Sequence, residues 1–291
     1  MNNIYQLLDN KHIEMSKKMK EPVVLIDLSN YIFHRFHAVS AWCKISDTKF
    51  ETNQQYIDMY ERMFEKHLLN IKKKCKCEWT NLFLLADCPR EEIWRNQYYT
   101  DYKKNRDLKV KQELIPEVFG KTYSSIIPRL QSSFKFNLIR SARAEADDIV
   151  GVLKMHIRDK YSTRPIVIIS NDNDYIQLID NHTKVYNHAF KNLLERIPKE
   201  ILNAVDENII GNVFLTYKIL KGDISDNITP VSKMSNKKML SLVLKTKEDE
   251  FEDCMLNEKF KQMYDRNNLL INLSMTPDDI KEDIIKKLKN V

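Results

Sequence analysis

Nine acidic residues lie at the ends of short apolar segments or soon after them, where their side chains could act together. They are Asp27, Asp87, Glu145, Asp147, Asp148, Asp172, Asp174, Asp223 and Asp226. Clustered carboxylates repel one another unless a cation lies among them. Oxygen ligands without an accompanying His or Cys suit hard cations better than zinc. The pattern therefore predicts a site for two Mg²⁺ ions, which Mn²⁺ could replace, of the kind that activates a water and stabilises the leaving oxygen of a phosphoryl displacement.

The elements that must position these acids alternate between strand and helix. Apolar segments at 23–28, 82–87, 136–139 and 166–170 have strand character, and three are continuously hydrophobic, as in strands buried on both faces of a parallel sheet. Helical apolar spacing occurs at 56–74 and 145–160. We therefore predict an α/β fold with a mostly parallel central sheet flanked by helices. The carboxyl ends of parallel strands share one edge, so the acids should converge there, although a single Asp at a strand end is also typical of a turn.

A change in pattern near residue 198 indicates a second region. Strand-like segments end there, and a helical apolar stripe from Ile210 to Leu220 is followed by Gly222, a residue typical of helix ends. Another helix is predicted to begin at Thr276 and Pro277. We expect an N-terminal extension at 1–20, an α/β core at 21–200 and a smaller helical region at 201–291.

The composition excludes several classes of protein. Only four glycines occur in 291 residues, so the Gly-rich loops that bind nucleotide phosphates are absent. No apolar run approaches the ~18 residues of a membrane helix, and the first twenty residues lack a secretory signal, which favours an intracellular protein without a membrane partner. The five cysteines lack zinc-finger spacing and are expected to be reduced thiols.

The net charge of +6 combines two opposed populations. Setting the nine clustered acids aside leaves 32 acidic residues against 47 basic ones, an excess of 15. A basic protein around an acidic site suits a polyanionic substrate. Basic side chains interleaved with aromatic ones between Trp94 and Lys111 are the mixture expected for single-stranded nucleic acid, although a solvated helix would show it too.

Short motifs spread along the chain resemble those of the structure-specific 5′ nucleases, the flap endonuclease family. The matching motifs are LIDLSN around Asp27, LLAD ending at Asp87, YKKNR at 102–106, EADD at 145–148, ISNDNDYIQL around Asp172, KILKGDISDNI around Asp223 and RNNLLINLSMTPDDI at 266–280. Each motif is short, but their order and spacing are specific and cover 23–288. The resemblance implies a fold of the PIN and 5′-nuclease type.

The resemblance also implies an activity. The chain would be a Mg²⁺-dependent 5′–3′ exonuclease and flap endonuclease with RNase H-like activity in DNA replication or repair. Its substrates would be 5′ flaps, nicks and forks of DNA and RNA primers annealed to DNA. It would act as a monomer, with replication proteins as further partners. We expect a phage- or virus-encoded protein that acts inside the host cell.

Individual residues take roles by the same resemblance. Asp27, Asp87, Glu145, Asp147 and Asp172 would hold the more tightly bound ion, and Asp148, Asp174, Asp223 and Asp226 would surround the second, with Asp147 shared. Lys103 would offset charge on the attacked phosphate, and Arg106 would bind a neighbouring phosphate. The segment at about 90–125 would form an arch over a single-stranded 5′ end, with contacts from Arg95, Tyr98, Tyr102 and Lys104.

One stretch departs from the family pattern. Members usually follow their last acids with a Gly-rich turn between two helices that binds duplex phosphates and a monovalent ion, whereas this chain has ITPVSKMSNKKMLSLV without glycine. Lys233, Lys237 and Lys238 could still contact phosphates, so the region 201–291 is expected to bind DNA. The C-terminal IIKKLKNV also lacks the motif for binding a sliding clamp.

Three alternative interpretations concern the clustered acids and two nearby histidines. A catalytically silent DNA-junction-binding protein would retain the fold but lose one or two central acids, and all nine are present. A phosphatase with a DxD nucleophile would need an acid two residues after Asp27, where Ser29 stands. His34 and His37 could form a metal pair, but without a Cys or a third His nearby they fit helix-surface or core positions better.

Overall fold

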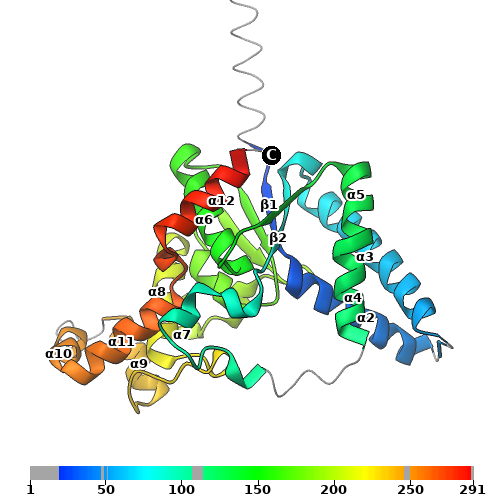
Figure 1. Ribbon diagram of the computed structural model, residues 1–291. Helices are drawn as coiled ribbons and strands as arrows, with labels where there is room; N and C mark the ends of the chain where they lie inside the picture. Colours follow the sequence, from blue (N-terminus) through cyan, green and yellow to red (C-terminus); the bar gives the residue numbers. More distant parts are fainter. Residues whose placement is uncertain (1–19, 47–48, 51, 107–113, 246–249, 290–291) are drawn as a thin grey trace, which may run out of the picture.

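The computed structural model places five parallel strands in one central sheet (Figure 1). The structure describes residues 20–46, 49–50, 52–106, 114–245 and 250–289. The strands are β1 (Val23–Asp27), β2 (Leu82–Ala86), β3 (Asn137–Arg140), β4 (Ile166–Ile169) and β5 (Thr183–Tyr186), in the order β3-β2-β1-β4-β5. Every strand pair is parallel, which confirms the predicted α/β fold with a parallel sheet flanked by helices.

The register of the sheet brings the ends of β1 and β2 together. Asp27, the last residue of β1, pairs with Leu85, so Asp87 follows two residues beyond that pair at the same edge. Every residue of β1 and β2 is buried, as their continuous hydrophobicity predicts. β5 was not predicted, because TKVY is short and contains no continuous apolar run.

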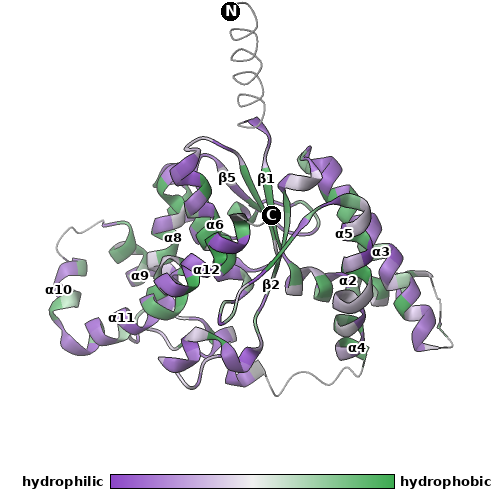
Figure 2. Cartoon of the chain, turned by 45° about the horizontal axis from the view of Figure 1, so that its top comes forward, coloured by the Kyte–Doolittle hydropathy of each residue, from purple (hydrophilic) through white to green (hydrophobic). Residues whose placement is uncertain are grey.

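Helices cover both faces of the sheet, and Figure 2 shows hydrophobic residues along the strands between the two helix layers. On one face lie α2 (Leu28–Ser46), α3 (Asn53–Cys75), α4 (Leu114–Lys121) and α5 (Ile127–Phe134), with a π-helical turn at Thr122–Ile126. These helices bury an apolar cluster against β1, β2 and β4. Tyr60 and Phe64 of α3 are fully buried in it, as the helical spacing at 56–74 predicts.

The other face is covered by α6 (Ala146–Lys160) together with helices from the C-terminal part of the chain. That part contains α7 (Lys199–Leu202), α8 (Glu207–Lys221), α9 (Asn236–Val243), α10 (Glu250–Leu256), α11 (Glu258–Ile271) and α12 (Asp278–Lys289). A single apolar cluster runs from the strands through α6 into α8, α9, α11 and α12. The C-terminal helices therefore share a core with the α/β part, and the division at residue 200 stays a prediction.

Short 3-10 helices connect these elements. They are η1 (Trp79–Asn81), η2 (Arg90–Glu92), η3 (Trp94–Gln97), η4 (Lys104–Arg106), η6 (Asn173–Leu178), η7 (Leu193–Arg196), η8 (Ile224–Asp226) and η9 (Leu273–Met275). Two of them, η6 and η8, carry acids of the predicted site. Among the helices in the described ranges, none combines the length and apolarity needed to cross a membrane.

Candidate active site

Acids that follow the strands meet at the carboxyl edge of the sheet. Asp27 is 8% exposed, and its carboxylate accepts hydrogen bonds from the Asn30 N–H (2.9 Å) and the Tyr175 hydroxyl (2.9 Å). Asp87 Oδ1 accepts the N–H of Ala146 (2.7 Å) at the start of α6. The partial positive charge of a helix N-terminus stabilises a carboxylate in this position. The ends of β1 and β2 and the start of α6 thus contribute to one site.

Three of these acids form no ion pair with any described residue, although Lys103 lies near enough to Asp87 to lower its pKa against the effect of burial. Within the described residues, no Lys, Arg or His forms an ion pair with Asp27, Asp87 or Asp172, and we name these three the unpaired acids. Burial, together with the charges of Asp87 and Asp172, raises the pKa of Asp27 to about 7. Burial also raises the pKa of Asp87 and that of Asp147, whose Oδ1 lies 4.0 Å from Arg95 Nη1. Raised carboxyl pKa values at one edge mark a site that lacks positive charge.

Lys218 of α8 supplies positive charge to another part of the edge. Its Nζ forms ion pairs with Asp174, after β4, and with Asp223 Oδ2 at 3.0 Å. Burial would raise the pKa of Asp223, but Lys218 lowers it below its usual value. Carboxylate oxygens of Asp174, Asp223 and Asp226 lie within 4.8 Å of one another. The sequence analysis did not single out Lys218, because a lysine in the last turn of a helix is ordinary helix electrostatics.

Lys103, the residue before η4, pairs with two further acids. Its Nζ forms ion pairs with Glu145 and with Asp226 Oδ2 at 3.5 Å, and its backbone N–H donates to the Asp226 carbonyl (3.0 Å). Burial would raise the pKa of Glu145, but Lys103 and Arg95 lower it to about 2. These contacts hold Lys103 at a φ of 57°, in the left-handed region. We name the four acids that face a lysine the paired acids: Glu145, Asp174, Asp223 and Asp226.

Two glycines allow the paired acids to approach the sheet. Gly222 ends α8 with a φ of 70°, and a Cβ there would lie 2.6 Å from the Ile228 carbonyl oxygen. Gly211 lets α8 approach η6, since a Cβ would lie 2.5 Å from the Gln177 carbonyl oxygen. These close approaches place α8 and the turn that follows it against the rest of the site.

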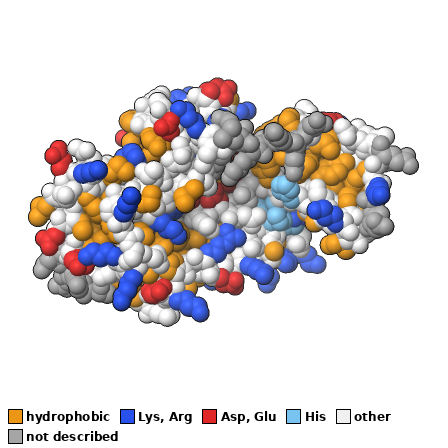
Figure 3. Space-filling view, turned by 90° about the horizontal axis from the view of Figure 1, so that it is seen from below, with side chains coloured by type: hydrophobic (Ala, Val, Ile, Leu, Met, Phe, Trp, Pro, Cys, Tyr) orange, Lys and Arg blue, Asp and Glu red, His pale blue; other side chains and the backbone are white. Residues whose placement is uncertain are grey.

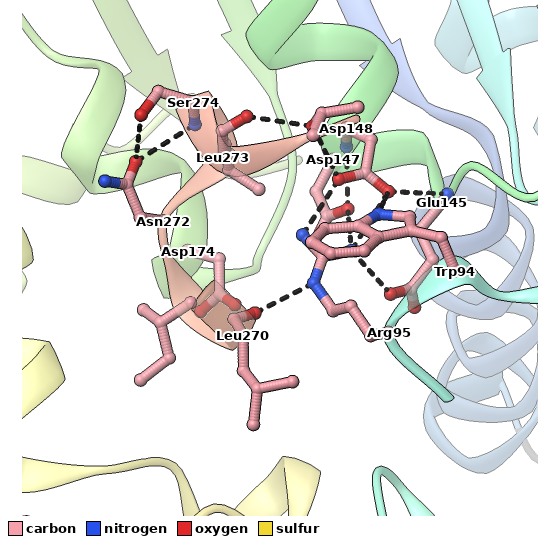
Figure 4. Close-up of polar contacts among 12 residues, drawn as sticks. Trp94, Arg95, Glu145, Asp147, Asp148, Asp174, Leu270, Asn272, Leu273 and Ser274 are labelled. Carbon is pink, nitrogen blue, oxygen red and sulfur yellow. Dashed lines mark hydrogen bonds and ion pairs between the residues drawn. The ribbon is translucent and has the colours of Figure 1, made fainter. Parts of the chain in front are cut away.

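Asp148, predicted to surround the second ion, is enclosed by protein donors (Figure 4). It is fully buried, and its carboxylate accepts hydrogen bonds from Trp94 Nε1 (3.1 Å), Thr276 Oγ1 (3.0 Å), the Glu145 N–H (3.0 Å) and both Nη atoms of Arg95 (2.9 and 2.8 Å). Five donors occupy the lone pairs of the carboxylate and leave no position for a cation. The assignment of Asp148 as a metal ligand is therefore corrected, because its side chain ties α6 to η3 and to the segment before α12.

Arg95, predicted to contact nucleic acid, is a structural cation. It is 1% exposed, and besides Asp148 its guanidinium donates to Glu145 Oε2 (3.1 Å) and to the Leu270 carbonyl (2.8 Å) (Figure 4). Oxygens of Glu145, Asp147 and Asp148 lie within 4.8 Å of one another, and Arg95 lies beside all three, whereas Lys103 pairs with Glu145. A buried guanidinium with these partners cannot reach a substrate, so the prediction for Arg95 is wrong.

A second predicted nucleic-acid contact is also buried. Tyr102 is 5% exposed, and its hydroxyl donates to Glu145 Oε2 (2.9 Å) and to Asp226 Oδ2 (3.4 Å). It is corrected to a side chain that positions two of the paired acids. Tyr98, in contrast, is 59% exposed, and Lys104 is exposed as well, so both stay predictions.

The remaining predicted contacts lie in α9, in the segment before it and at the end of η4. Lys233 and Lys237 are exposed, and Lys238 is half-buried with its Nζ 2.8 Å from Glu250 Oε1. The side chain of Arg106 lies outside the described residues. All four assignments stay predictions.

Comparisons with known proteins agree with this geometry. The family described as "5'-3' exonuclease, N-terminal resolvase-like domain" matches residues 22–207. The 5′–3′ exonuclease of Buchnera aphidicola is 28% identical, with 90% of this chain and 83% of that protein aligned. The ribonuclease H of bacteriophage T4 is 26% identical, with 74% of this chain and 72% of that protein aligned. The DNA polymerase I of Streptococcus pneumoniae is 27% identical over 94% of this chain, which spans 30% of that longer protein.

Solved structures share the fold. A structure of the 5′-exonuclease of bacteriophage T5 with bound zinc has a TM-score of 0.63 at 17% identity and covers 93% of this chain and 99% of the other. The flap endonuclease of the same phage, in a complex with DNA and metal ions, has a TM-score of 0.61 at 18% identity over 91% and 98% of the two chains. At this identity the likeness establishes the arrangement of the elements.

The parallel sheet with acids along its carboxyl edge, together with these relatives, defines a nuclease, an enzyme that cleaves phosphodiester bonds. Because the family match covers more than half of the sequence, the chain belongs to the 5′–3′ exonuclease family. The expectation of a phage- or virus-encoded protein is wrong, because membership of this family does not imply such an origin. Its bacterial relatives include 5′–3′ exonucleases of Buchnera aphidicola and the DNA polymerase I of Streptococcus pneumoniae and of Pseudomonas aeruginosa.

Proposed function

We propose that this chain is a divalent-cation-dependent 5′ nuclease that hydrolyses phosphodiesters at the 5′ ends of branched, flapped or nicked DNA and of RNA primers annealed to DNA. The unpaired acids carry this proposal. Asp27, Asp87 and Asp172 lie together without a counter-ion among the described residues, and burial raises the pKa of Asp27 to about 7. A site with this deficit of positive charge suits a cation from solution.

The donor set fits Mg²⁺, with Mn²⁺ as a substitute. The ligand groups within the described residues consist of carboxylates, which hard divalent cations prefer. The unpaired acids, Glu145 and Asp147 would hold one ion. Asp174, Asp223 and Asp226, whose oxygens lie within 4.8 Å of one another, would surround a second. A pair of such ions, when bound, supplies an activated water and stabilises the leaving oxygen.

Lys103 and Arg106 are proposed to act on the substrate phosphate. The Lys103 ammonium lies between Glu145 and Asp226, where it can also donate to a phosphate oxygen that enters the site. The Tyr102 hydroxyl donates to the same two carboxylates, so the partners that orient the ammonium are themselves held in place. A cation fixed before the substrate arrives stabilises developing negative charge without further reorganisation.

Nucleic acid is proposed to reach the acidic edge from two regions. The segment at about 90–125, of which 107–113 lie outside the described residues, would form the arch over a single-stranded 5′ end, with Tyr98 and Lys104 as contacts. The helical region at 201–291 would bind duplex through Lys233, Lys237 and Lys238. Figure 3 supports this arrangement, since acidic side chains lie in a hollow at the centre of the face and Lys and Arg side chains lie around it. The chain would act as a monomer in DNA replication or repair, with replication proteins as partners.

The alternative of a catalytically silent DNA-junction-binding protein has no support in the comparisons. All nine acids are present in the sequence. Of these, Asp148 alone is enclosed by five protein donors in the part of the chain that the structure describes. The acids that remain suffice for the proposed ions.

A panel of 5′-labelled substrates tests the proposal. A DNA flap, a nicked duplex and an RNA–DNA hybrid are incubated with the chain in Mg²⁺, in Mn²⁺ and in EDTA, and product lengths are read on a denaturing gel. We expect cleavage near the 5′ end of each substrate in either metal and none in EDTA. Cleavage in EDTA at the Mg²⁺ rate would contradict the cation requirement, and binding without cleavage in both metals would favour the silent binder.

A further inference from the structure

A second basic site lies between α2 and α3. A cavity of about 750 Å³ opens there, on the helix layer that covers one face of the sheet. No Asp or Glu of the described residues lines it. Four of its side chains carry a positive charge, namely Arg35, Arg62, Lys66 and Lys73. The cavity therefore attracts anions.

Arg35 differs from the other basic residues of the cavity because it is buried. It is 8% exposed, yet no carboxylate of the described residues pairs with it, and its Nε has no hydrogen-bond partner. Its Nη2 donates to Nδ1 of His34 (2.6 Å), an imidazole that is neutral at pH 7 because burial and Arg35 lower its pKa to about 4. A buried guanidinium without a counter-ion is costly unless an anion from outside compensates it.

His67 lines the same wall as a neutral side chain and adds no charge to it. Its Nε2 lies 2.9 Å from the His188 carbonyl oxygen, which can only accept, so Nε2 carries the proton and Nδ1 does not. Burial lowers the pKa of His67 to about 4, which keeps the ring neutral at pH 7. The buried Nδ1 has no partner.

The rest of the cavity wall is apolar. Trp42 of α2 is 37% exposed and Leu69 of α3 is 41% exposed, and Met59 and Met63 lie beside them. Aromatic and thioether side chains pack well against flat rings. The cavity thus offers cations and an apolar wall, which match the phosphate and the base of a nucleotide.

We propose that this cavity binds a single nucleotide, with its phosphate on Arg35 and its base against Trp42. The choice of a nucleotide rests on the proposed nuclease function, whereas the need for an anion rests on the uncompensated charge of Arg35. A free nucleoside phosphate and the end of an unpaired strand share this chemistry, so the test includes both sources.

Hydrogen bonds connect the cavity with the acidic edge. Leu28, the first residue of α2, directly follows Asp27, and Arg35 lies seven residues further along this helix, a distance of about 10 Å. Asn30 donates its N–H to Asp27, and its Oδ1 accepts from His188 Nε2 (2.9 Å) and from the Asn171 N–H (3.0 Å). Figure 3 shows histidine side chains next to the acidic hollow. A nucleotide in the cavity would therefore lie close to the unpaired acids and on the same face.

Thermal unfolding of the full chain in EDTA tests the proposal. Deoxyadenosine monophosphate, inorganic phosphate and a short single-stranded oligodeoxynucleotide are each added to wild type, Arg35→Gln and Trp42→Ala. The matched control is Lys199→Gln, which removes one charge from an exposed position outside the cavity. We expect wild type and control to gain about 2–3 °C at a tenfold excess of nucleotide over its dissociation constant. Arg35→Gln and Trp42→Ala should lose most of this gain.

Three further results are expected from the same scans. Without ligand, Arg35→Gln should unfold at the wild-type temperature or above it, because the substitution removes an uncompensated buried charge. Inorganic phosphate should shift wild type less than the nucleotide does, because it cannot reach Trp42. If the oligonucleotide raises the unfolding temperature more than deoxyadenosine monophosphate does, the ligand is the end of a strand. If the two shifts are equal, the ligand is the free nucleotide.

Equal nucleotide shifts in wild type and Arg35→Gln would overturn the proposal, as would phosphate shifts as large as those of the nucleotide. If Arg35→Gln without ligand unfolds many degrees below wild type, the comparison rests on Trp42→Ala, because Trp42 is partly exposed. A nucleotide-induced rise in unfolding temperature as large in Trp42→Ala as in wild type then overturns the proposal. Cleavage of a 5′ flap in Mg²⁺ is measured in parallel. Failure of the proposed function appears as no cleavage by wild type, whereas failure of this inference appears as unchanged nucleotide shifts with cleavage intact.

Discussion

The acidic edge has two parts that carry similar acids and different countercharges. The unpaired acids Asp27, Asp87 and Asp172 have no ion-pair partner among the described residues, whereas each paired acid lies against Lys103 or Lys218. The pKa values of Asp27 and Glu145 differ in the same way. Burial raises the pKa of Asp27 to about 7, and although burial would also raise the pKa of Glu145, Lys103 and Arg95 lower it to about 2.

The difference shows where the fold leaves positive charge to come from solution. Lys103 and Lys218 compensate their acids before any ligand binds. The unpaired acids repel one another until a divalent cation binds among them. We therefore place the tighter ion at the unpaired acids, and we expect ion and lysine to compete for the same oxygens at the paired acids.

Removal of one unpaired acid should have the largest effect. Asp172→Asn keeps the shape of the side chain but removes its charge, so we expect flap cleavage in Mg²⁺ to fall by about 10³-fold while flap binding changes by less than about threefold. Initial rates and fluorescence polarisation measure these two quantities. Asp278→Asn, at a side chain that is 91% exposed, is the matched control and should cleave like wild type. Cleavage at the wild-type rate by Asp172→Asn would remove this residue from the metal site.

Asp148 should affect stability and not metal binding. Asp148→Asn leaves Arg95 buried without its bidentate partner, so the free energy of unfolding should fall by about 3–5 kcal/mol. Urea denaturation measures this loss, and calorimetry below the unfolding temperature should find the wild-type number of bound ions. If Asp148→Asn has the wild-type free energy of unfolding but binds one ion fewer, Asp148 is a metal ligand after all.

The unpaired acids should also make stability depend on pH when no metal is present. The pKa of Asp27 is about 7 in the folded chain against 3.8 for an ordinary Asp, so the folded state binds more protons than the unfolded state between these values. The free energy of unfolding in EDTA should therefore fall as pH rises from about 4 to about 7, by about 3–4 kcal/mol. Glu145 acts in the opposite direction only below its ordinary value of 4.5. Mg²⁺ should abolish the fall, and a fall of the same size in Mg²⁺ would contradict binding at these acids.

Replacement of Lys218 should have the smallest effect and should act on the second ion. Lys218→Gln frees the carboxylates of Asp174 and Asp223, so the weaker of two Mn²⁺ ions should bind about tenfold more tightly. Isothermal titration calorimetry measures the change. Lys221→Gln, at an exposed position on the same helix, is the control. An unchanged dissociation constant for the weaker ion would show that Lys218 and this ion do not compete for the carboxylate oxygens.

Sequence patterns predicted the elements that depend on long hydrophobic stretches. β1 and β2 are buried along their whole length, and such strands are continuous apolar runs in the sequence. β5 was not predicted, because its four residues alternate between buried positions and exposed or partly exposed ones. The position of Asp27 and Asp87 at one edge followed from parallel strands alone, since no contact between side chains had to be known.

The countercharges could not be predicted from the same patterns. Arg95 and Tyr98 lie in one basic and aromatic segment, yet Arg95 is 1% and Tyr98 is 59% exposed. Which of the two turns inward depends on Asp148 and on the Leu270 carbonyl, which are far away in the sequence. Lys218 likewise meets Asp174 only because α8 docks on η6.

A titration with Mn²⁺ followed by calorimetry tests the central claim most directly, on wild type and on Asp27→Asn. The claim is that the unpaired acids hold the tighter divalent cation. We predict two bound ions for wild type and loss of the tighter one in Asp27→Asn. Binding by Asp27→Asn with the affinity and stoichiometry of wild type would contradict the claim.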